Sequence, residues 1–360
     1  MKLITSNFPP LATANSNFPS RWNELFFESE FITLGIGYAS NDSLLYLLRL
    51  LEVNEKKNFN ICLGMAYFEG LSRSQHEAVE KVSLFLDESK SGQFYIARTF
   101  PFHGKVYHFG GNSKKSTSII GSSNFSNIVP LKGIEQRKYE VDFETDDHLI
   151  NQSIDKFLDS LLHDASVPFS AIRDSIRIKE NRNPLLDFRS DIEKVEPERL
   201  EVICSKVKGG SFEVPLKDAQ RSNLNVYFGK GRKGQQNYVT PRPWYEVEII
   251  VDTSVQKSNK GYPANKEFIT YTDDGYRIVM KTSGDYGKNL RSRDDLSILG
   301  RWIKGRLETS SCLISGEMVT ETTLAKYGRN TISLSKTSLT EKDLVSGNTL
   351  EVWFMNFGTT

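Results

Sequence analysis

Apolar runs and amphipathic segments alternate over roughly the first 165 residues of the chain. The runs at 31–38, 60–65 and 93–97 are mainly apolar and predict buried strands. Between them, residues 42–52 and 74–88 place leucine and valine three and four positions apart, which predicts helices with one apolar face. A strand at 138–143 and a further amphipathic helix at 148–163 follow. Strands that alternate with helices predict an α/β domain.

The pattern changes after about residue 216. Short strand-like runs dominate there, separated by Asn, Asp, Gly and Pro; they lie at 247–251, 268–272, 276–280, 331–334 and 350–354. The turn Thr272-Asp273-Asp274-Gly275 between two of them predicts a β-hairpin. Residues 299–307 are the one expected helix. Many short strands with few helices predict a mainly-β domain, a small barrel or pseudobarrel.

The stretch between these halves, residues 166–215, is dense in charge and predicts an interdomain linker. Leu185, Leu186 and Phe188 interrupt the charges, so we expect the linker to pack on another part of the protein. With 360 residues the chain has room for two domains of ordinary size. The predicted organisation is therefore a domain at 1–165, a linker at 166–215 and a domain at 216–360.

Composition limits the kinds of binding partner and the cellular location that we expect. The formal net charge is +1, so a nucleic-acid surface would have to be local. Cys62, Cys204 and Cys312 are odd in number and lack C-x-x-C spacing, which predicts reduced thiols and neither a zinc site nor a disulfide framework. No apolar run approaches membrane-spanning length, and the N-terminus lacks the pattern of a signal peptide. We expect a soluble cytoplasmic protein that contacts no membrane.

One stretch of the first half contains candidate catalytic residues. Residues 102–107 read as a strand in which His103 and Lys105, two positions apart, point to the same face. A second strand, 118–121, then ends in Ser122, Ser123 and Asn124. A cation beside short polar donors suits a phosphate site better than a protein core.

H-x-K followed at this distance by G-S-S-N-F resembles the phospholipase D superfamily, and most closely its restriction endonucleases of the BfiI and NgoFVII type. The resemblance implies a mixed sheet flanked by helices and hydrolysis of phosphodiesters through a phosphohistidine, without a metal or other cofactor. It makes His103 the nucleophile, has Lys105 and Asn124 hold the phosphoryl oxygens, and has Glu135 orient the imidazole. Ser122 and Ser123 match the small polar positions before the Asn. Gly110 replaces the Asp that the wider superfamily has five residues after the Lys, which favours the nuclease branch.

The reaction also needs an acid to protonate the leaving oxygen, and in this superfamily that acid is the His of a second H-x-K. The other four histidines, His76, His108, His148 and His163, lack a Lys two residues later. The chain thus holds half an active site, and we expect a homodimer that brings two copies of His103 together. A lone His on a strand is more often structural, but its conjunction with residues 121–124 and Glu135 favours function. Arg137 and Lys138 are either further phosphate contacts or solvated charges.

Two basic segments of the second half predict contacts to double-stranded DNA, because Arg and Asn or Gln can read bases and Lys holds phosphate. The candidate residues are Asn225, Lys230, Arg232, Lys233, Gln236, Asn237, Tyr238, Lys288, Asn289, Arg291, Ser292 and Arg293. These arms, with T-D-D-G and the later I-L-G-R-W-I-K, resemble the plant-type B-three DNA-binding domain. The alternative is that they are solvated loops on a barrel.

Together these features predict a site-specific, type II-like restriction endonuclease. The resemblance also implies an ATPase or helicase-like partner subunit and a cognate DNA methyltransferase. Two other classes are weighed against this one. A DNA-binding regulator with an inactive nuclease domain is disfavoured by the joint presence of His103, Lys105, Asn124 and Glu135. A lipid phosphodiesterase is disfavoured by the basic arms and the lack of a membrane-binding apolar segment.

Overall fold

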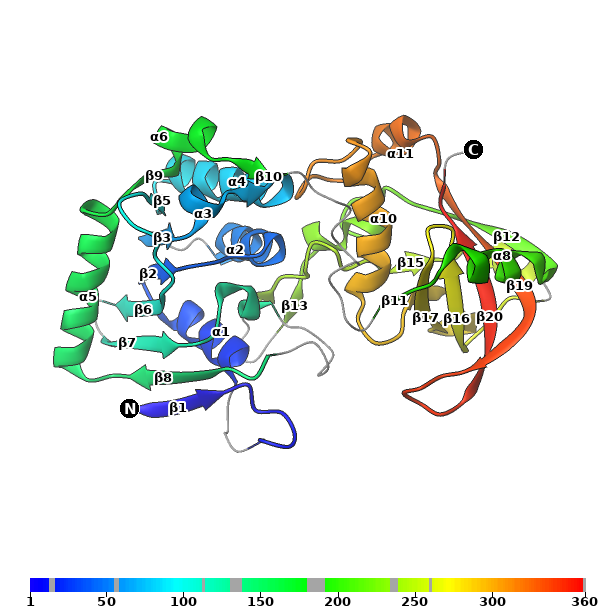
Figure 1. Cartoon of the computed structure of the whole chain (residues 1–360), viewed down its shortest axis with the longest axis horizontal. Helices are drawn as coiled ribbons and strands as arrows, with labels where there is room; N and C mark the ends of the chain where they lie inside the picture. The colour runs from blue at the N-terminus through cyan, green and yellow to red at the C-terminus, as the bar shows by residue number, and fades with distance from the viewer. Residues whose placement is uncertain are drawn as a thin grey trace. The chain divides into compact units, whose positions relative to one another are not determined.

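The computed structural model describes residues 1–12, 17–54, 58–111, 114–129, 138–179, 192–233, 239–258 and 261–358. Its contacts divide the chain into two compact units (Figure 1). The first comprises residues 1–181 and 232–241, and the second comprises residues 182–231 and 242–360.

The first unit is built on one mixed sheet. Its strands, in spatial order, are β1 (Lys2–Thr5), β8 (Val141–Thr145), β7 (Lys114–Gly121), β6 (Lys105–Gly111), β2 (Phe31–Ile36), β3 (Phe59–Leu63), β5 (Gly92–Ala97) and β9 (Ser166–Pro168). β2, β3 and β5 run parallel to one another, whereas β6 joins β2 antiparallel and continues antiparallel to β7. The sheet predicted from the apolar runs is therefore confirmed, with the H-x-K segment beside its central strands.

Helices cover both faces of this sheet. Figure 1 shows α5 on one side and α1, α2 and α4 on the other. The helices of this unit are α1 (Phe18–Glu28), α2 (Asn41–Asn54), α3 (Ala66–Glu69), α4 (Arg73–Ser89), α5 (His148–His163) and α6 (Phe169–Ile172), with 3-10 turns η1 (Phe125–Ile128) and η2 (Arg173–Ser175). The helices predicted at 42–52, 74–88 and 148–163 are confirmed within two residues at each end.

Local sequence explains these helices. The leucines of α2 are buried, and a reciprocal capping pair of Ser72 and Gln75 begins α4. Asp147 accepts the backbone N–H groups of Leu149 and Ile150 at the start of α5. The buried stripe of α5 then packs on the sheet, in a cluster of Cys62, Ala97, Val106, Ile154, Leu158, Leu161, Leu162 and Ala165.

The second unit is mostly β. Its sheet runs in the order β12 (Val207–Pro215), β19 (Thr331–Lys342), β20 (Thr349–Asn356), β16 (Glu267–Thr272), β17 (Tyr276–Ser283), β18 (Asn289–Ser292) and β15 (Ile249–Ile250), and β11 (Glu193–Lys194) pairs with β17. Its helices are α8 (Pro197–Ser205), α9 (Thr253–Ser258), α10 (Ser297–Thr309) and α11 (Glu321–Tyr327), with 3-10 turns η3 (Asn223–Phe228) and η5 (Asp285–Gly287). The mainly-β class is confirmed, and closure into a pseudobarrel stays a prediction.

The T-D-D-G turn and helix α10 are bound to each other. The turn joins β16 and β17 as predicted, with Gly275 at a φ of +88°. Asp274 accepts the indole N–H of Trp302 at 2.9 Å, and Asp273 accepts from Arg306 at 2.5 Å. These two motifs of the predicted DNA-binding half therefore stabilise its fold.

The predicted linker is shorter than residues 166–215. β9 pairs with β5, and β10 (Ile178–Lys179) pairs with β4 (Leu71–Ser72), so residues 166–179 belong to the first unit. β12 pairs with β19 in the second unit. The sequence does not predict these strands because their partners are distant along the chain. Leu185, Leu186 and Phe188 lie outside the described residues.

A hairpin from the predicted second domain is grouped with the first unit. β13 (Arg232–Lys233) pairs with β14 (Val239–Thr240), and β14 contacts α2. The two units are therefore not divided at one position such as residue 216, because the chain leaves the first unit after residue 181, returns to it at 232–241 and then continues in the second.

Over the described ranges, the chain has no helix that is long and apolar enough to cross a membrane.

Candidate active site and DNA contacts

Two glycines allow the H-x-K segment to lie directly against the ends of β2 and β3. The N–H of Gly37 donates to the carbonyl of Gly104 at 2.8 Å, and the N–H of Phe102 donates to the carbonyl of Gly64 at 3.3 Å. A Cβ at Gly64 would lie 1.9 Å from the Phe102 oxygen. A side chain at position 64 would push this segment away, and with it His103, which is exposed two residues before β6 begins.

His103 and Lys105 lie side by side, as predicted. The Lys105 Nζ is 3.4 Å from both ring nitrogens of His103 and donates to the His103 carbonyl at 3.0 Å. An atom in the ring plane at equal distances from both nitrogens would overlap Cε1, so the ammonium lies over the ring face. The in-plane directions of both nitrogens are thus not taken by Lys105.

Burial lowers the pKa of Lys105, and the nearby carboxylate of Glu140 acts in the opposite direction. Glu140 also accepts the hydroxyl of Ser122 at 2.5 Å. Sequence analysis missed Glu140 as a site residue. The available signal was its position just before β8, the strand that pairs with the end of β7.

The loop after β7 divides into a structural and an accessible part. Ser123 is 1% exposed, and its N–H and hydroxyl donate to the two carboxylate oxygens of Asp142 at 3.0 and 2.6 Å. Asp142 is itself buried, which raises its pKa. Both donors of Ser123 are thus used to anchor the loop, and its predicted catalytic role stays a prediction. Ser122 is exposed.

Asn124 follows this anchor. Its side-chain Oδ1 is buried and has no hydrogen-bond partner within the described part of the chain. Buried polar atoms are nearly always paired in native proteins, and an exception calls for an explanation such as a ligand-binding role. The unpaired atom is an acceptor, so it would not bind a phosphoryl oxygen itself; a phosphate contact by Asn124 would use the Nδ2–H group and stays a prediction.

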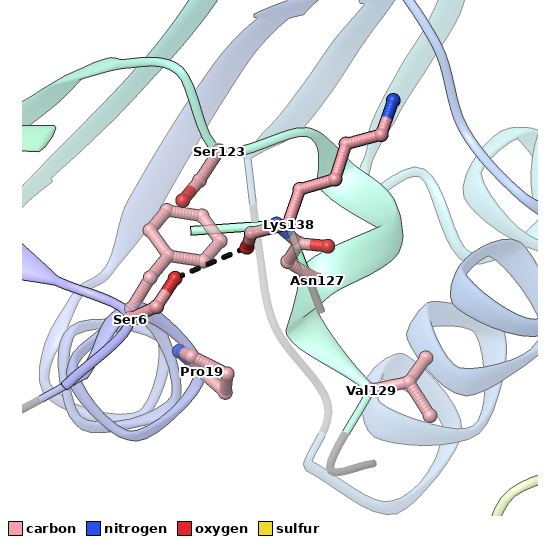
Figure 2. A pocket seen from close by; sticks show the side chains of 7 residues that line it. Ser6, Pro19, Ser123, Asn127, Val129 and Lys138 are labelled. Atoms are coloured by element: carbon pink, nitrogen blue, oxygen red, sulfur yellow. Dashed lines mark hydrogen bonds between the residues drawn. The ribbon is translucent and has the colours of Figure 1, made fainter. Parts of the chain in front are cut away.

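Glu135, the predicted orienting acid, and Arg137 lie outside the described residues. Lys138 is exposed, and its carbonyl accepts the Ser6 hydroxyl at 3.4 Å while its ammonium points away from Ser6 (Figure 2). The cavity beside Ser6 and Lys138, which Ser123 and Asn127 also line, measures about 30 Å³. That volume holds a water or two but no nucleotide.

Three predicted DNA contacts are internal to the second unit. Asn225 is fully buried and bonds the backbone of Asp218 and Val319. Ser292 is also fully buried and donates to the Asp295 carbonyl. Arg293, whose side chain is 9% exposed, pairs with Asp343 and Asp294, both at 2.7 Å. Asn225 joins the segments around Asp218 and Val319, whereas Ser292 and Arg293 hold the end of β18 to its neighbouring segments. Burial leaves little of these side chains for DNA, and their contacts to DNA stay predictions.

The other predicted contacts keep some accessible surface where the structure describes them. Lys230, Arg232 and Lys233 are exposed, and Lys288 is half-buried and pairs with Asp285 at 2.9 Å. Asn289 and Arg291 are half-buried. Gln236, Asn237 and Tyr238 lie outside the described residues. Across the described ranges, no cluster of three or more His, Cys, Asp or Glu could hold a metal ion.

Comparison with known proteins gives a separate match for each half of the chain. The family model for the N-terminal PLD domain of the NgoFVII restriction endonuclease matches residues 17–179. The model for the NgoFVII C-terminal B3-like DNA-binding domain matches residues 202–338. The two matches confirm the predicted family, its enzyme class and the order of its domains.

Other comparisons add little. No curated protein matches the chain. The crystal structure of polyphosphate kinase from Porphyromonas gingivalis is similar over 56% of this chain, with 12% identity and a TM-score of 0.32. The chain spans 27% of that kinase. A similarity this weak carries no argument about fold or function.

Proposed function

We propose that this chain, which belongs to the NgoFVII-type restriction endonucleases, cleaves DNA through a phosphohistidine formed on His103. The observation that carries the proposal is the position of Lys105 over the His103 ring, which places a cation at the nucleophile and leaves the ring nitrogens open in their own plane. The two family matches supply the class of substrate, DNA.

The first step is an in-line attack of a His103 nitrogen on phosphorus, which forms the N–P bond and breaks one P–O bond. Lys105 and the Asn124 amide stabilise the negative charge that develops on the phosphoryl oxygens. Water then attacks phosphorus, the N–P bond breaks, and His103 is restored. Glu135 is proposed to hold the second ring nitrogen. In this mechanism the side chains of Lys105 and Asn124 stabilise the negative charge on the phosphoryl oxygens, and no metal is required.

The leaving oxygen needs a proton in the first step. None of the other four histidines has a Lys two residues later, and His108 is in addition 2% exposed and bonded to Ser118 at 2.8 Å, so it is a poor donor to a substrate. We therefore assign this role to His103 of a second copy of the chain, in a homodimer with one active site at the two-fold axis.

The second half selects the cleavage site. Lys230, Arg232, Lys233, Lys288, Asn289 and Arg291 remain its candidate contacts to double-stranded DNA, together with Gln236, Asn237 and Tyr238. An ATPase or helicase-like partner subunit and a cytoplasmic location belong to the same proposal.

Plasmid cleavage in EDTA tests this mechanism. Wild-type protein is expected to give discrete fragments, His103→Ala none, and His148→Ala, which removes an exposed histidine on α5, the wild-type pattern. A labelled DNA strand should also become attached through its phosphate to the wild-type protein and not to His103→Ala.

Cleavage that persists in His103→Ala would refute the role of His103. Absence of cleavage in both EDTA and magnesium would be followed by addition of ATP and the product of the neighbouring gene. Continued inactivity would favour a DNA-binding regulator.

A further inference from the structure

Tyr38 is held next to the proposed nucleophile at the end of the central strand β2. It follows Gly37, just beyond the end of β2. The Gly37 N–H bonds the Gly104 carbonyl, and a Cβ at Gly37 would lie 3.0 Å from the Cα of His103. The backbones of these two segments are in direct contact, so the side chains of Tyr38 and His103 emerge together.

The two rings are in contact. Their centroids are 5.2 Å apart and their planes are inclined at 77°, an edge-to-face arrangement that aromatic pairs favour. Lys105 lies over a face of the same imidazole. Among the described residues, no hydrogen-bond acceptor holds either His103 nitrogen, so the ring is restrained there by packing against Tyr38, Lys105 and the backbone of Gly37.

Tyr38 is anchored in turn by Glu69, the last residue of α3. The phenol donates to Glu69 Oε1 at 2.6 Å, and this bond raises the pKa of Tyr38, which keeps the phenol neutral and donating. The Glu69 carbonyl accepts from Arg177 at 3.1 Å. The Tyr38 ring is 37% exposed, so water could satisfy its hydroxyl; the bond to Glu69 instead restricts where the ring can lie.

We infer that Tyr38, anchored by Glu69, is a positioning residue that orients the His103 imidazole for attack on phosphorus. The inference rests on the proposed function. Tyr38 makes no bond to the reacting atoms in this role. Its contribution is to limit rotation of the imidazole, so that one nitrogen faces phosphorus when DNA binds.

A different role would leave a different kinetic signature. An exposed tyrosine beside an active site could instead stack on a base or sugar of the substrate, and its loss would then weaken DNA binding. A positioning residue affects the rate of the chemical step and leaves affinity for DNA unchanged.

The test uses the full-length protein, saturating DNA and single-turnover conditions. Tyr38→Ala is expected to slow cleavage and phosphohistidine formation about ten- to a hundred-fold, because small misplacements of a reacting group are costly. Tyr38→Phe keeps the ring and loses the anchor, so a smaller loss is expected. Glu69→Ala should match Tyr38→Phe, whereas Glu69→Gln, which keeps an acceptor, should stay near wild type. DNA affinity should be unchanged throughout.

Phe68→Ala is the matched control, because it removes a 39% exposed aromatic from the same short helix. Thermal unfolding checks each variant, and Tyr38→Phe and Glu69→Ala carry the test if Tyr38→Ala does not fold. Wild-type rates in the Tyr38 variants, or a loss confined to DNA affinity, would overturn the inference while the proposed function stands. If wild-type protein never cleaves and His103→Ala behaves identically, both fail.

Discussion

At the scale of the residue, the charge on Glu140 sets the pH range in which Lys105 can act. Burial lowers the pKa of Lys105 and Glu140 raises it, so removing the carboxylate lowers that pKa further. The ammonium is then lost at a lower pH. In Glu140→Gln, cleavage activity is expected to decline at a lower pH on the alkaline side than in wild type, as a rate profile across neutral and alkaline pH would show.

Ser122→Ala separates this effect from the hydrogen bond that Ser122 makes to Glu140 at 2.5 Å, because the substitution removes the bond and keeps the charge. Its alkaline decline should stay close to that of wild type. Superimposable profiles for Glu140→Gln and wild type would mean that Glu140 acts on the loop and not on Lys105.

At the scale of the element, the pair of Arg293 and Asp343 joins the segment after β18 to the segment after β19. The two side chains are 9% and 2% exposed and 2.7 Å apart. Burial raises the pKa of Asp343, but the hydrogen bonds from Arg293 and Ser346 outweigh it and hold that pKa well below its ordinary value. A depressed carboxyl pKa stabilises the fold above the unfolded-state value, and this stabilisation is lost as pH falls through the folded-state value.

Asp343→Asn is therefore expected to lower the free energy of unfolding by about 3 kcal/mol near neutral pH, because it removes the buried carboxylate that pairs with a largely buried guanidinium and leaves that guanidinium only its more exposed partners. The difference from wild type should shrink in acid, as urea unfolding at several pH values would measure. Asp294→Asn is the control, since that partner of Arg293 is 51% exposed. A constant difference at every pH would contradict the assignment.

At the scale of the whole molecule, a nuclease half and a recognition half predict separable effects on DNA. Lys288→Ala should weaken binding to all sequences alike and reduce the slope of log affinity against log salt by about one, since Lys288 is expected to contact phosphate.

Arg291→Ala, as a base reader, should cost about 1–3 kcal/mol at one base position. Binding titrations on a set of single-base variants at several salt concentrations would measure both. Equal losses on every sequence would make Arg291 a phosphate contact.

Sequence patterns predicted the elements that depend on neighbouring residues. The leucines of 42–52 and the apolar stripe of 148–163 gave the positions of α2 and α5, and T-D-D-G gave the hairpin between β16 and β17. These succeeded because helical periodicity and turn chemistry are local. The adjacency of His103 and Lys105 also follows from two positions in one short segment.

The sequence predicts a linker where β9 and β12 lie, because strand pairing depends on partners that are distant along the chain. Likewise, nothing near Asn225 along the chain indicates that its amide bonds Val319, 94 residues away. Arg293 appears in the sequence as a solvated basic residue, and its partner Asp343 is 50 residues away. Residue type alone could not distinguish a DNA contact from an internal hydrogen bond.

The sequence by itself determined the family, the order of the two domains and the identity of the H-x-K and G-S-S-N residues, because these are set by residue type and short spacing. Only the tertiary structure decided which polar residues are accessible, and it alone brought Tyr38 and Glu140 to the site. Accessibility depends on contacts between segments far apart in the chain, since burial of a polar group is stable only when distant partners satisfy it.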